Sequence, residues 1–355
     1  MAEHGTLRAR VYDSKSRLQM AEGRLDAQRG ERTDIADMFL VSHYEQPELS
    51  DQYRIDLVLP DGRTVAVGID ELRALPTREI VAVLECAGNG RGLRDSRAPG
   101  NQFGLGMFGQ AKWVGTSLRT VLAEFDGTEG WEYAVLHAPD NGVTQPEDKH
   151  AYFAKGLHRD KALHPDTMLC WQVNDGPLPV EHGGPVRLVV PGWYGIWWVK
   201  WPTRIDLTST EFHGFWQHER YTYQDDNGEV LAVVGQQRPR AVVLSPEEGE
   251  AVGDDAVISG VAWAGPRQVA RVEITADDGT NWIPAELAAP EGAWSWVRWN
   301  ARLPAGLPRG MRRIAARVVD DAGETQDWTA PLDRLGYGNN QIHIVNVDLI
   351  ARPRG

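Results

Sequence analysis

One cysteine in the first third of the chain stands where chemistry is expected. Residues 80–84 read Ile-Val-Ala-Val-Leu, and Cys86 follows at the start of the run Cys-Ala-Gly-Asn-Gly-Arg. A β-branched apolar run is typical of a buried strand, so a thiol at its end is held in a fixed position. The two glycines allow the backbone to approach a bulky ligand closely. The pattern therefore indicates a thiol displayed beside a ligand.

A thiolate is a suitable ligand for a soft, polarisable metal ion. Cys86 has no companion cysteine or histidine at zinc or iron-sulfur spacing, so the remaining ligands would come from a cofactor. Two other interpretations stay open at this point. In the first, Cys86 is a small buried hydrophobic residue, which is the commoner role of an isolated cysteine. In the second, it is a thiol nucleophile that pairs with a histidine distant in sequence.

A second motif supplies positive charge. Residues 176–195 read Gly-Pro-Leu-Pro-Val-Glu-His-Gly-Gly-Pro-Val-Arg-Leu-Val-Val-Pro-Gly-Trp-Tyr-Gly, and Val-Lys-Trp follows at 199–201. His182, Arg187 and Lys200 are donors or cations around glycine-rich turns, a combination that suits an anionic cofactor. Taken singly, Arg187 could form a strand-end ion pair and His182 a turn hydrogen bond. The motif as a whole favours cofactor binding.

Together with Glu-Cys-Ala-Gly-Asn-Gly-Arg at 85–91 and Trp-Gln at 216–217, these motifs resemble the molybdopterin domain of sulfite oxidases. The resemblance covers about residues 35–350 and rests on several separated motifs in the same order. It implies a molybdenum ion held by the Cys86 thiolate and by the dithiolene of one molybdopterin. The redox chemistry would belong to that cofactor. The residues that match the family's cofactor contacts are His43, Asp140, His182, Arg187 and Lys200.

The resemblance also implies a reaction and partners. A sulfite oxidase oxidises sulfite, or a related sulfur oxyanion, to sulfate by oxygen-atom transfer and passes the electrons to an external acceptor. The chain has no Cys-x-x-Cys-His haem motif, so the acceptor is expected to be a separate cytochrome, another carrier or dioxygen. The net charge of −13 would attract a basic cytochrome c. The C-terminal part resembles the family's dimerisation domain, which implies a homodimer.

The expected catalytic residues are Cys86, Arg91 and Tyr221. Arg91 matches one of the arginines with which the family binds its anionic substrate, and Tyr221 matches the family's active-site tyrosine. Several convergent fixed positive charges are needed to stabilise a desolvated dianion. The arginine is therefore expected to be a direct substrate contact.

Other positions depart from the family's substrate pocket. Two further arginines of the family fall on Val41 and Leu335, and a pocket tryptophan falls on Phe103. Either Arg94 or Arg334 restores the lost charge from a neighbouring position, or the substrate is less anionic than sulfite. The second interpretation points to sulfane sulfur oxidation or sulfoxide reduction. A scaffold that binds the cofactor without turnover is a third hypothesis.

The elements that position these residues belong to two predicted domains. A hairpin is expected at 53–67 and helices around 69–75 and 117–125, which makes the first domain mixed α and β. After residue 236, short β-rich stretches alternate with turns, a pattern typical of an immunoglobulin-like sandwich. The predicted fold class is α+β, with an N-terminal arm at 1–34, a molybdopterin-binding domain at 35–236 and a dimerisation domain at 237–355.

Composition excludes several function classes. No apolar run approaches the roughly 18 residues of a membrane span, and the negative charge disfavours nucleic acid as a partner. The two cysteines do not form a disulfide framework, and Cys170 is expected to be a buried core thiol. The first residues lack the apolar core of an export signal. A cytoplasmic location is expected, or a periplasmic one if a leader was trimmed.

Overall fold

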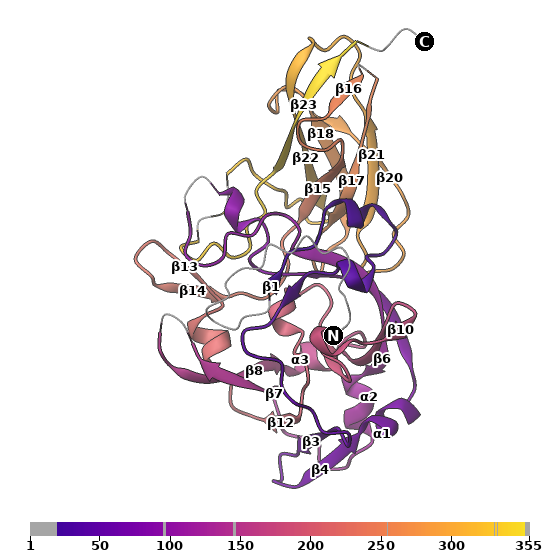
Figure 1. Cartoon of the computed structure of the whole chain (residues 1–355). Helices are drawn as coiled ribbons and strands as arrows, with labels where there is room; N and C mark the ends of the chain where they lie inside the picture. The colour runs from indigo at the N-terminus through magenta and orange to yellow at the C-terminus, as the bar shows by residue number, and fades with distance from the viewer. Residues whose placement is uncertain are drawn as a thin grey trace.

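The computed structural model describes residues 20–94, 97–144, 147–253, 255–329, 331 and 333–351. A β-sandwich from the C-terminal third stands at one end of a larger unit built from the rest of the chain (Figure 1). Most elements are strands. The described α-helices are short: α1 (Ile69–Ala74), α2 (Leu118–Ala123) and α3 (Arg159–Ala162). The first domain is therefore richer in strands than the predicted mixed α and β domain.

The sheet that carries the cysteine loop has the strand order β10-β9-β6-β5, and β11 also pairs with β9. Its strands are β5 (Arg78–Glu85), β6 (Phe108–Ser117), β9 (Met168–Val173), β10 (Gly176–Pro177) and β11 (Arg187–Val189). β5 confirms the strand predicted before Cys86, and Arg187 opens β11. The same sheet thus holds Arg187 and leads directly into Cys86.

The second sheet has the order β4-β3-β12-β7-β8. Its strands are β3 (Arg54–Val58), β4 (Thr64–Gly68), β7 (Tyr133–Val143), β8 (His150–His158) and β12 (Arg204–Thr208). Antiparallel pairing of β3 with β4 confirms the predicted hairpin. α1 and α2 confirm the two predicted helices; in α2 the Ser117 side chain caps the first turn by accepting from the N–H of Thr120. One hydrophobic core contains residues of both sheets, including Trp113, Leu136 and Leu188.

Residues 20–33, which fall within the predicted N-terminal arm, pack against the larger unit. β1 (Met20–Ala21) pairs with β2 (Leu40–Val41), and 3₁₀ turns follow at Asp26–Arg29 and Ile35–Asp37. Gln28 and Thr33 are fully buried and hydrogen-bonded to each other. This segment packs through polar pairs rather than an apolar stripe, so its sequence shows no apolar periodicity. Residues 1–19 of the predicted arm lie outside the described part of the chain.

The C-terminal third forms two facing sheets of order β15-β17-β21-β20 and β16-β23-β22-β18-β19. Residues of both sheets share one core, which includes Ile258 and Ile314. The strands of this sandwich are β15 (Arg240–Ser245), β16 (Ala251–Gly253), β17 (Val257–Trp263), β18 (Val269–Thr275), β19 (Ile283–Pro284), β20 (Glu286–Leu287), β21 (Val297–Arg302), β22 (Gly310–Asp320) and β23 (His343–Ile350).

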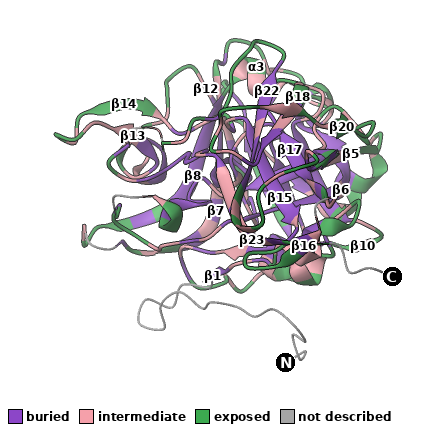
Figure 2. Cartoon of the chain, turned by 90° about the horizontal axis from the view of Figure 1, so that it is seen from above, coloured by how far each residue is buried: buried purple, intermediate pink, exposed green. Residues whose placement is uncertain are grey.

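A third apolar cluster joins the sandwich to the larger unit. Val83 and Phe108 of the cysteine-bearing sheet pack in it with Val242, Trp263 and Trp296 of the C-terminal third. Figure 2 shows this continuous buried interior within an exposed rim. The predicted boundaries at 34/35 and 236/237 stay predictions, because the packing runs across both of these points.

The hairpin of β13 (Thr222–Gln224) and β14 (Val230–Val233) lies at the side of the larger unit, and much of β14 is exposed (Figures 1 and 2). Within the described residues, no helix has the length and apolar character needed to cross a membrane.

The close packing of β6 on β9 predicts that Gly115→Ala destabilises the protein. A Cβ at Gly115 would collide with the backbone oxygen of Leu169, which cannot move without disturbing the sheet. We expect the free energy of unfolding to fall by about 1 to 3 kcal/mol in urea denaturation. Gly176→Ala is the matched control, because no atom lies within 4 Å of a Cβ there. Equal effects of the two substitutions would contradict this packing.

Candidate active site

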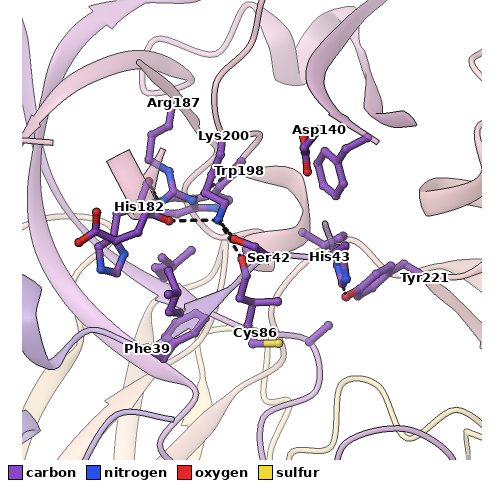
Figure 3. A pocket seen from close by; sticks show the side chains of 18 residues that line it. Phe39, Ser42, His43, Cys86, Asp140, His182, Arg187, Trp198, Lys200 and Tyr221 are labelled. Atoms are coloured by element: carbon purple, nitrogen blue, oxygen red, sulfur yellow. Dashed lines mark hydrogen bonds between the residues drawn. The ribbon is translucent and has the colours of Figure 1, made fainter. Parts of the chain in front are cut away.

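A cavity with about 700 Å³ of space, part of it open to solvent, lies at the end of β5. Figure 3 shows Arg187 and Lys200 on one side, His43 and Tyr221 on the other, and the sulfur of Cys86 below them. The predicted site residues that line the cavity are His43, Cys86, Asp140, His182, Arg187, Lys200 and Tyr221. Arg91 is the predicted residue that does not.

Cys86 is half-buried, and its loop is fixed by backbone hydrogen bonds. Its N–H donates to the carbonyl of Met107 at 2.9 Å, and its Sγ accepts from the N–H of Gly88 at 3.4 Å. Burial raises the pKa of the thiol to about 11, against the lowering effects of the Gly88 N–H and the Arg91 charge. A bound metal ion would reverse this balance, because a coordinating thiol is deprotonated. The left-handed conformation of Gly90 (φ +76°) allows the loop to turn.

Lys200 and Arg187 lie opposite each other across a single β-bridge. The Lys200 ammonium donates to the carbonyls of Val41 and Glu181 at 3.0 and 3.1 Å, and also to the Ser42 hydroxyl. Burial and the neighbouring Arg187 charge lower the pKa of Lys200 to about 7. An anion in the cavity would favour the charged form of this side chain.

Two buried polar atoms in the cavity wall lack a hydrogen-bond partner within the described chain. They are Nε of Arg187, a donor, and Oδ1 of Asp140, an acceptor. The Nη atoms of Arg187 donate to the carbonyls of His182 and Trp198 at 2.8 and 3.1 Å. Burial raises the pKa of Asp140 to about 6. Buried polar atoms are nearly always paired, so an unpaired donor and acceptor fit a ligand that offers both functions, as a pterin with a phosphate does.

Glycine makes room beside these cations. Gly183 adopts φ +107°, and a Cβ there would lie 2.9 Å from both Arg187 Cβ and Lys200 Cγ. The glycine-rich turn predicted from sequence thus brings His182, Arg187 and Lys200 to one side of the cavity.

On the opposite side, the Tyr221 hydroxyl and Nε2 of His43 are 2.9 Å apart in a hydrogen bond. The imidazole also stacks on Trp216, with ring centroids 4.1 Å apart. Burial, reinforced by the Lys200, Arg220 and Lys155 charges, lowers the pKa of His43 to about 3. Burial raises the pKa of Tyr221 well above its usual value. At neutral pH the pair therefore consists of a neutral imidazole and a protonated phenol.

Arg91 lies beside the cysteine loop and is connected to the cavity wall through aromatic contacts. Its guanidinium donates to the carbonyls of Leu335 and Asn101 at 3.1 and 3.2 Å and lies 4.7 Å from the Tyr337 ring. Tyr337 in turn stacks on Tyr221 at 4.7 Å. The predicted substrate role of Arg91 stays a prediction, and the structure places its guanidinium against the Tyr337 ring.

The positions that depart from the family pattern occupy different places. Val41 lines the cavity, whereas Leu335 packs against the main core. Phe103 is buried against the cysteine loop, where a Cβ at Gly88 would lie 3.2 Å from its ring.

Neither candidate replacement arginine lines the cavity. Arg94 donates to the carbonyl of Pro331, and the exposed Arg334 extends toward Gly228 on the β13–β14 hairpin. The expectation that one of them restores the lost positive charge is therefore not supported by the structure.

Lys155 was missed from sequence. It is fully buried in β8, where its Nζ donates to the Trp216 carbonyl at 2.6 Å and lies 4.7 and 5.5 Å from the Trp197 and Tyr221 rings. Burial lowers its pKa well below the usual value. Alternation along β8 was the signal available, because Lys155 falls in register with the buried Phe153 and Leu157.

Two tryptophans and the second cysteine have structural roles. The indole N–H groups of Trp197 and Trp198 donate to the carbonyls of Val234 and Trp193, so both rings are fixed as wall and packing. Cys170 is a fully buried free thiol in the core.

Two family models match this chain. Residues 43–216 match the oxidoreductase molybdopterin binding domain, and residues 233–350 match the Mo-co oxidoreductase dimerisation domain. The fold and the cavity thus belong to the class of molybdopterin-binding oxidoreductases.

Relatives of similar sequence show which family the chain belongs to. Mitochondrial sulfite oxidases of Rattus norvegicus and Homo sapiens are each 31% identical to the chain, over 88% and 87% of its length. An inducible nitrate reductase of Glycine max is 27% identical over 76% of the chain and 34% of its own length. The chain belongs to the sulfite oxidase family, and the predicted molybdenum-molybdopterin cofactor is confirmed as that of the family. The chain spans 60% of the length of the two sulfite oxidases.

A solved structure has the same fold. The sulfane dehydrogenase SoxCD from Paracoccus pantotrophus matches with a TM-score of 0.79 and 24% identity, over 96% of this chain and 89% of that chain. This match confirms the sulfite-oxidase-type fold predicted for the molybdopterin domain.

The buried ammonium of Lys155 predicts a pH-dependent stability difference. Because the folded pKa lies below the unfolded one, the unfolded chain binds more protons between these values, and stability rises with pH. Lys155→Met removes this dependence. Its stability relative to wild type should therefore decrease from pH 6 to 9 in urea denaturation, by at most about 1.4 kcal/mol per pH unit. Lys149→Met, at a half-exposed side chain, is the control, and a constant Lys155→Met difference would refute the argument.

Proposed function

We propose that the protein is a molybdenum-dependent oxidoreductase that acts on a small sulfur-containing substrate and exchanges electrons with an external partner. The single observation that carries this proposal is the cavity that joins the Cys86 thiol to unpaired cofactor-type contacts at Arg187 and Asp140. The bound cofactor would supply two-electron redox chemistry and oxygen-atom transfer at sulfur.

The residues of the chain would bind and orient the cofactor. Cys86 would ligate the metal, and Arg187, Lys200 and His182 would face the anionic part of the pterin. Asp140 would accept a hydrogen bond through its unpaired Oδ1. Arg187 and Lys200 can fill these roles in their present positions, because backbone carbonyls already hold both side chains.

His43 and Tyr221 would hold and transfer the protons that the reaction releases or takes up. Their hydrogen bond joins a neutral imidazole to a phenol at the wall of the cavity, so a proton can be held at the Tyr221 hydroxyl without a charged intermediate. Oxidation of the substrate by one oxygen atom of water releases two electrons and two protons. Reduction of a sulfoxide runs in the opposite direction, taking up two electrons and two protons and releasing water.

We infer that the preferred substrate carries less negative charge than sulfite, as a sulfane sulfur or a sulfoxide can. Val41 is apolar where the family has an arginine, and Arg94 and Arg334 do not line the cavity. Burying a dianion without convergent cations costs several kcal/mol, on the order of the desolvation penalty of each charge. Sulfite is the second candidate, favoured by the two sulfite oxidase relatives and by the position of Arg91.

The C-terminal domain would form a homodimer, in keeping with the matched dimerisation domain. We propose that it is immunoglobulin-like. The sheet order β15-β17-β21-β20 corresponds to strands A-B-E-D of that fold, and β23-β22-β18 corresponds to G-F-C.

A basic cytochrome c is the proposed electron acceptor because of the net charge of −13. A cytoplasmic location is proposed from the two free thiols.

The metal site predicts molybdenum bound through Cys86. Protein produced with molybdate should contain about one molybdenum per chain by mass spectrometry of the metal. Cys86→Ser should lose more than about 100-fold in activity, because even outer partners of metal ligands contribute 10- to 100-fold. Cys170→Ala, at the other thiol, should keep both metal and activity. Metal-free wild-type protein with full activity would reject the proposal, and metal-loaded protein without turnover would indicate a non-catalytic scaffold.

The substrate preference predicts a gain for sulfite on restoring the arginine. In steady-state assays with ferricyanide or cytochrome c, Val41→Arg should raise kcat/KM for sulfite by about 10- to 100-fold, since a hydrogen bond to a charged group contributes about 1.5 to 3 kcal/mol. Val41→Gln, a similar polar side chain without charge, is the control. Thiosulfate is assayed with the same acceptors, and dimethyl sulfoxide is assayed with a reduced electron donor, because its reduction takes up two electrons. Efficient wild-type sulfite turnover that Val41→Arg does not improve would favour sulfite as the natural substrate.

A further inference from the structure

The cysteine loop is held from outside its own domain. Three of its backbone carbonyls accept hydrogen bonds from residues of the C-terminal third. The Ala87 carbonyl accepts from the N–H of Gly338 at 2.8 Å. The Asn89 carbonyl accepts from Nη2 of Arg240 at 3.3 Å, and the Gly90 carbonyl accepts from Nδ2 of Asn339 at 2.6 Å.

A buried ion pair lies on the same side of the loop. Nε of Arg240 lies 2.9 Å from Oε1 of Glu85, and the two side chains are 2% and 1% exposed. Oε1 of Glu85 also accepts from Nδ2 of Asn89 at 3.1 Å, and Oε2 accepts from the indole of Trp263 at 2.9 Å. The pair therefore touches the chain immediately before Cys86 and three residues after it.

Stability alone does not account for such a pair. Desolvation of two buried charges offsets most of their attraction, and apolar side chains of similar volume often stabilise a core as well or better. The ion pair instead fixes the geometry of the cysteine loop. The planar guanidinium contacts Glu85 and the Asn89 carbonyl at once, across a loop whose glycines give it little stiffness of its own.

We propose that the C-terminal domain sets the position of the Cys86 thiol, with Glu85 and Arg240 as positioning residues. The inference rests on the proposed function for the identity of the metal ligand and goes beyond a role in dimerisation. Arg240 acts through the loop backbone and does not line the cavity. Loss of Arg240 would leave Glu85 unpaired beside Cys86 and would free the Asn89 carbonyl.

The test compares Arg240→Met, Arg240→Gln and the double variant Glu85→Gln/Arg240→Gln, in which two neutral amides replace the ion pair. The first readout is the rate at which iodoacetamide alkylates Cys86 in cofactor-free full-length protein, measured by peptide mass spectrometry. The second is molybdenum content after expression with molybdate. Melting temperature is recorded for each variant, so that loss of folding is recognised.

We expect Arg240→Met to raise the Cys86 alkylation rate by about 10-fold or more, since the loop loses the side chain that holds the Asn89 carbonyl and opens more often. Molybdenum content should fall, and the double variant should return both readouts most of the way to wild type. Arg317→Met is the matched control. It removes a partly exposed ion pair with Glu273 at 2.9 Å, between β18 and β22 of the sandwich, which makes no contact with the cysteine loop, and it should leave the alkylation rate within about twofold.

The outcomes are distinguishable. Wild-type protein without molybdenum overturns the proposed function. Arg240→Met protein with wild-type molybdenum content and alkylation rate overturns the positioning role, even if its melting temperature falls. If Arg240→Met does not fold, Arg240→Gln and the double variant are compared by the same two readouts. A double variant with the same altered rate as Arg240→Gln would also count against the pair.

Discussion

The whole site depends on holding one thiol at the end of a strand by a loop that is itself flexible. β5 is fixed along its length by pairing with β6, which places Glu85 and therefore Cys86. The loop that follows is rich in glycine, so its conformation is set by contacts from outside it. These contacts come from two later parts of the chain: Gly104 and Met107 of the larger unit, and Gly338 and Asn339 of the C-terminal third. The position of the thiol is thus a property of the two packed units together.

The second requirement of the site is positive charge that is shielded from solvent. Arg187 is buried and Lys200 half-buried on the cavity wall, and desolvation lowers the pKa of Arg187 to about 10 and of Lys200 to about 7. Backbone carbonyls accept hydrogen bonds from both side chains, but carbonyls do not neutralise charge. An anionic group placed between them favours the charged form of both side chains and compensates their desolvation. The acidic surface of the chain and its cationic cavity are therefore compatible. The surface charges attract or repel partners at long range, whereas the cavity cations act on a bound group in direct contact, where salt screens little.

The sequence predicted those parts of the site that are local in the chain. Cys86, the glycine turn before Arg187, and the flanking strands and helices follow from periodicity and motifs. The packing of residues 20–33, the placement of Arg91 against Tyr337 and the burial of Lys155 were not predicted. Each depends on partners that lie far apart in sequence: Thr33 meets Gln110, Arg91 meets Leu335, and Lys155 meets Trp216. A motif states which residue types occur, but the direction of a long side chain is decided by what packs against it.

This distinction matters most for the substrate. By sequence, Arg91 was the arginine retained from an anion-binding set, yet its donors are directed to the carbonyls of Leu335 and Asn101. The groups that face the cavity beside Cys86 are instead Val41, a neutral His43 and the phenol of Tyr221. A neutral donor and acceptor stabilise a dipolar sulfur–oxygen bond by hydrogen bonding, whereas a dianion needs fixed charge at short range. The retained arginine is therefore weaker support for sulfite than its place in the motif suggests, and the apolar residue at position 41 is the more informative of the two.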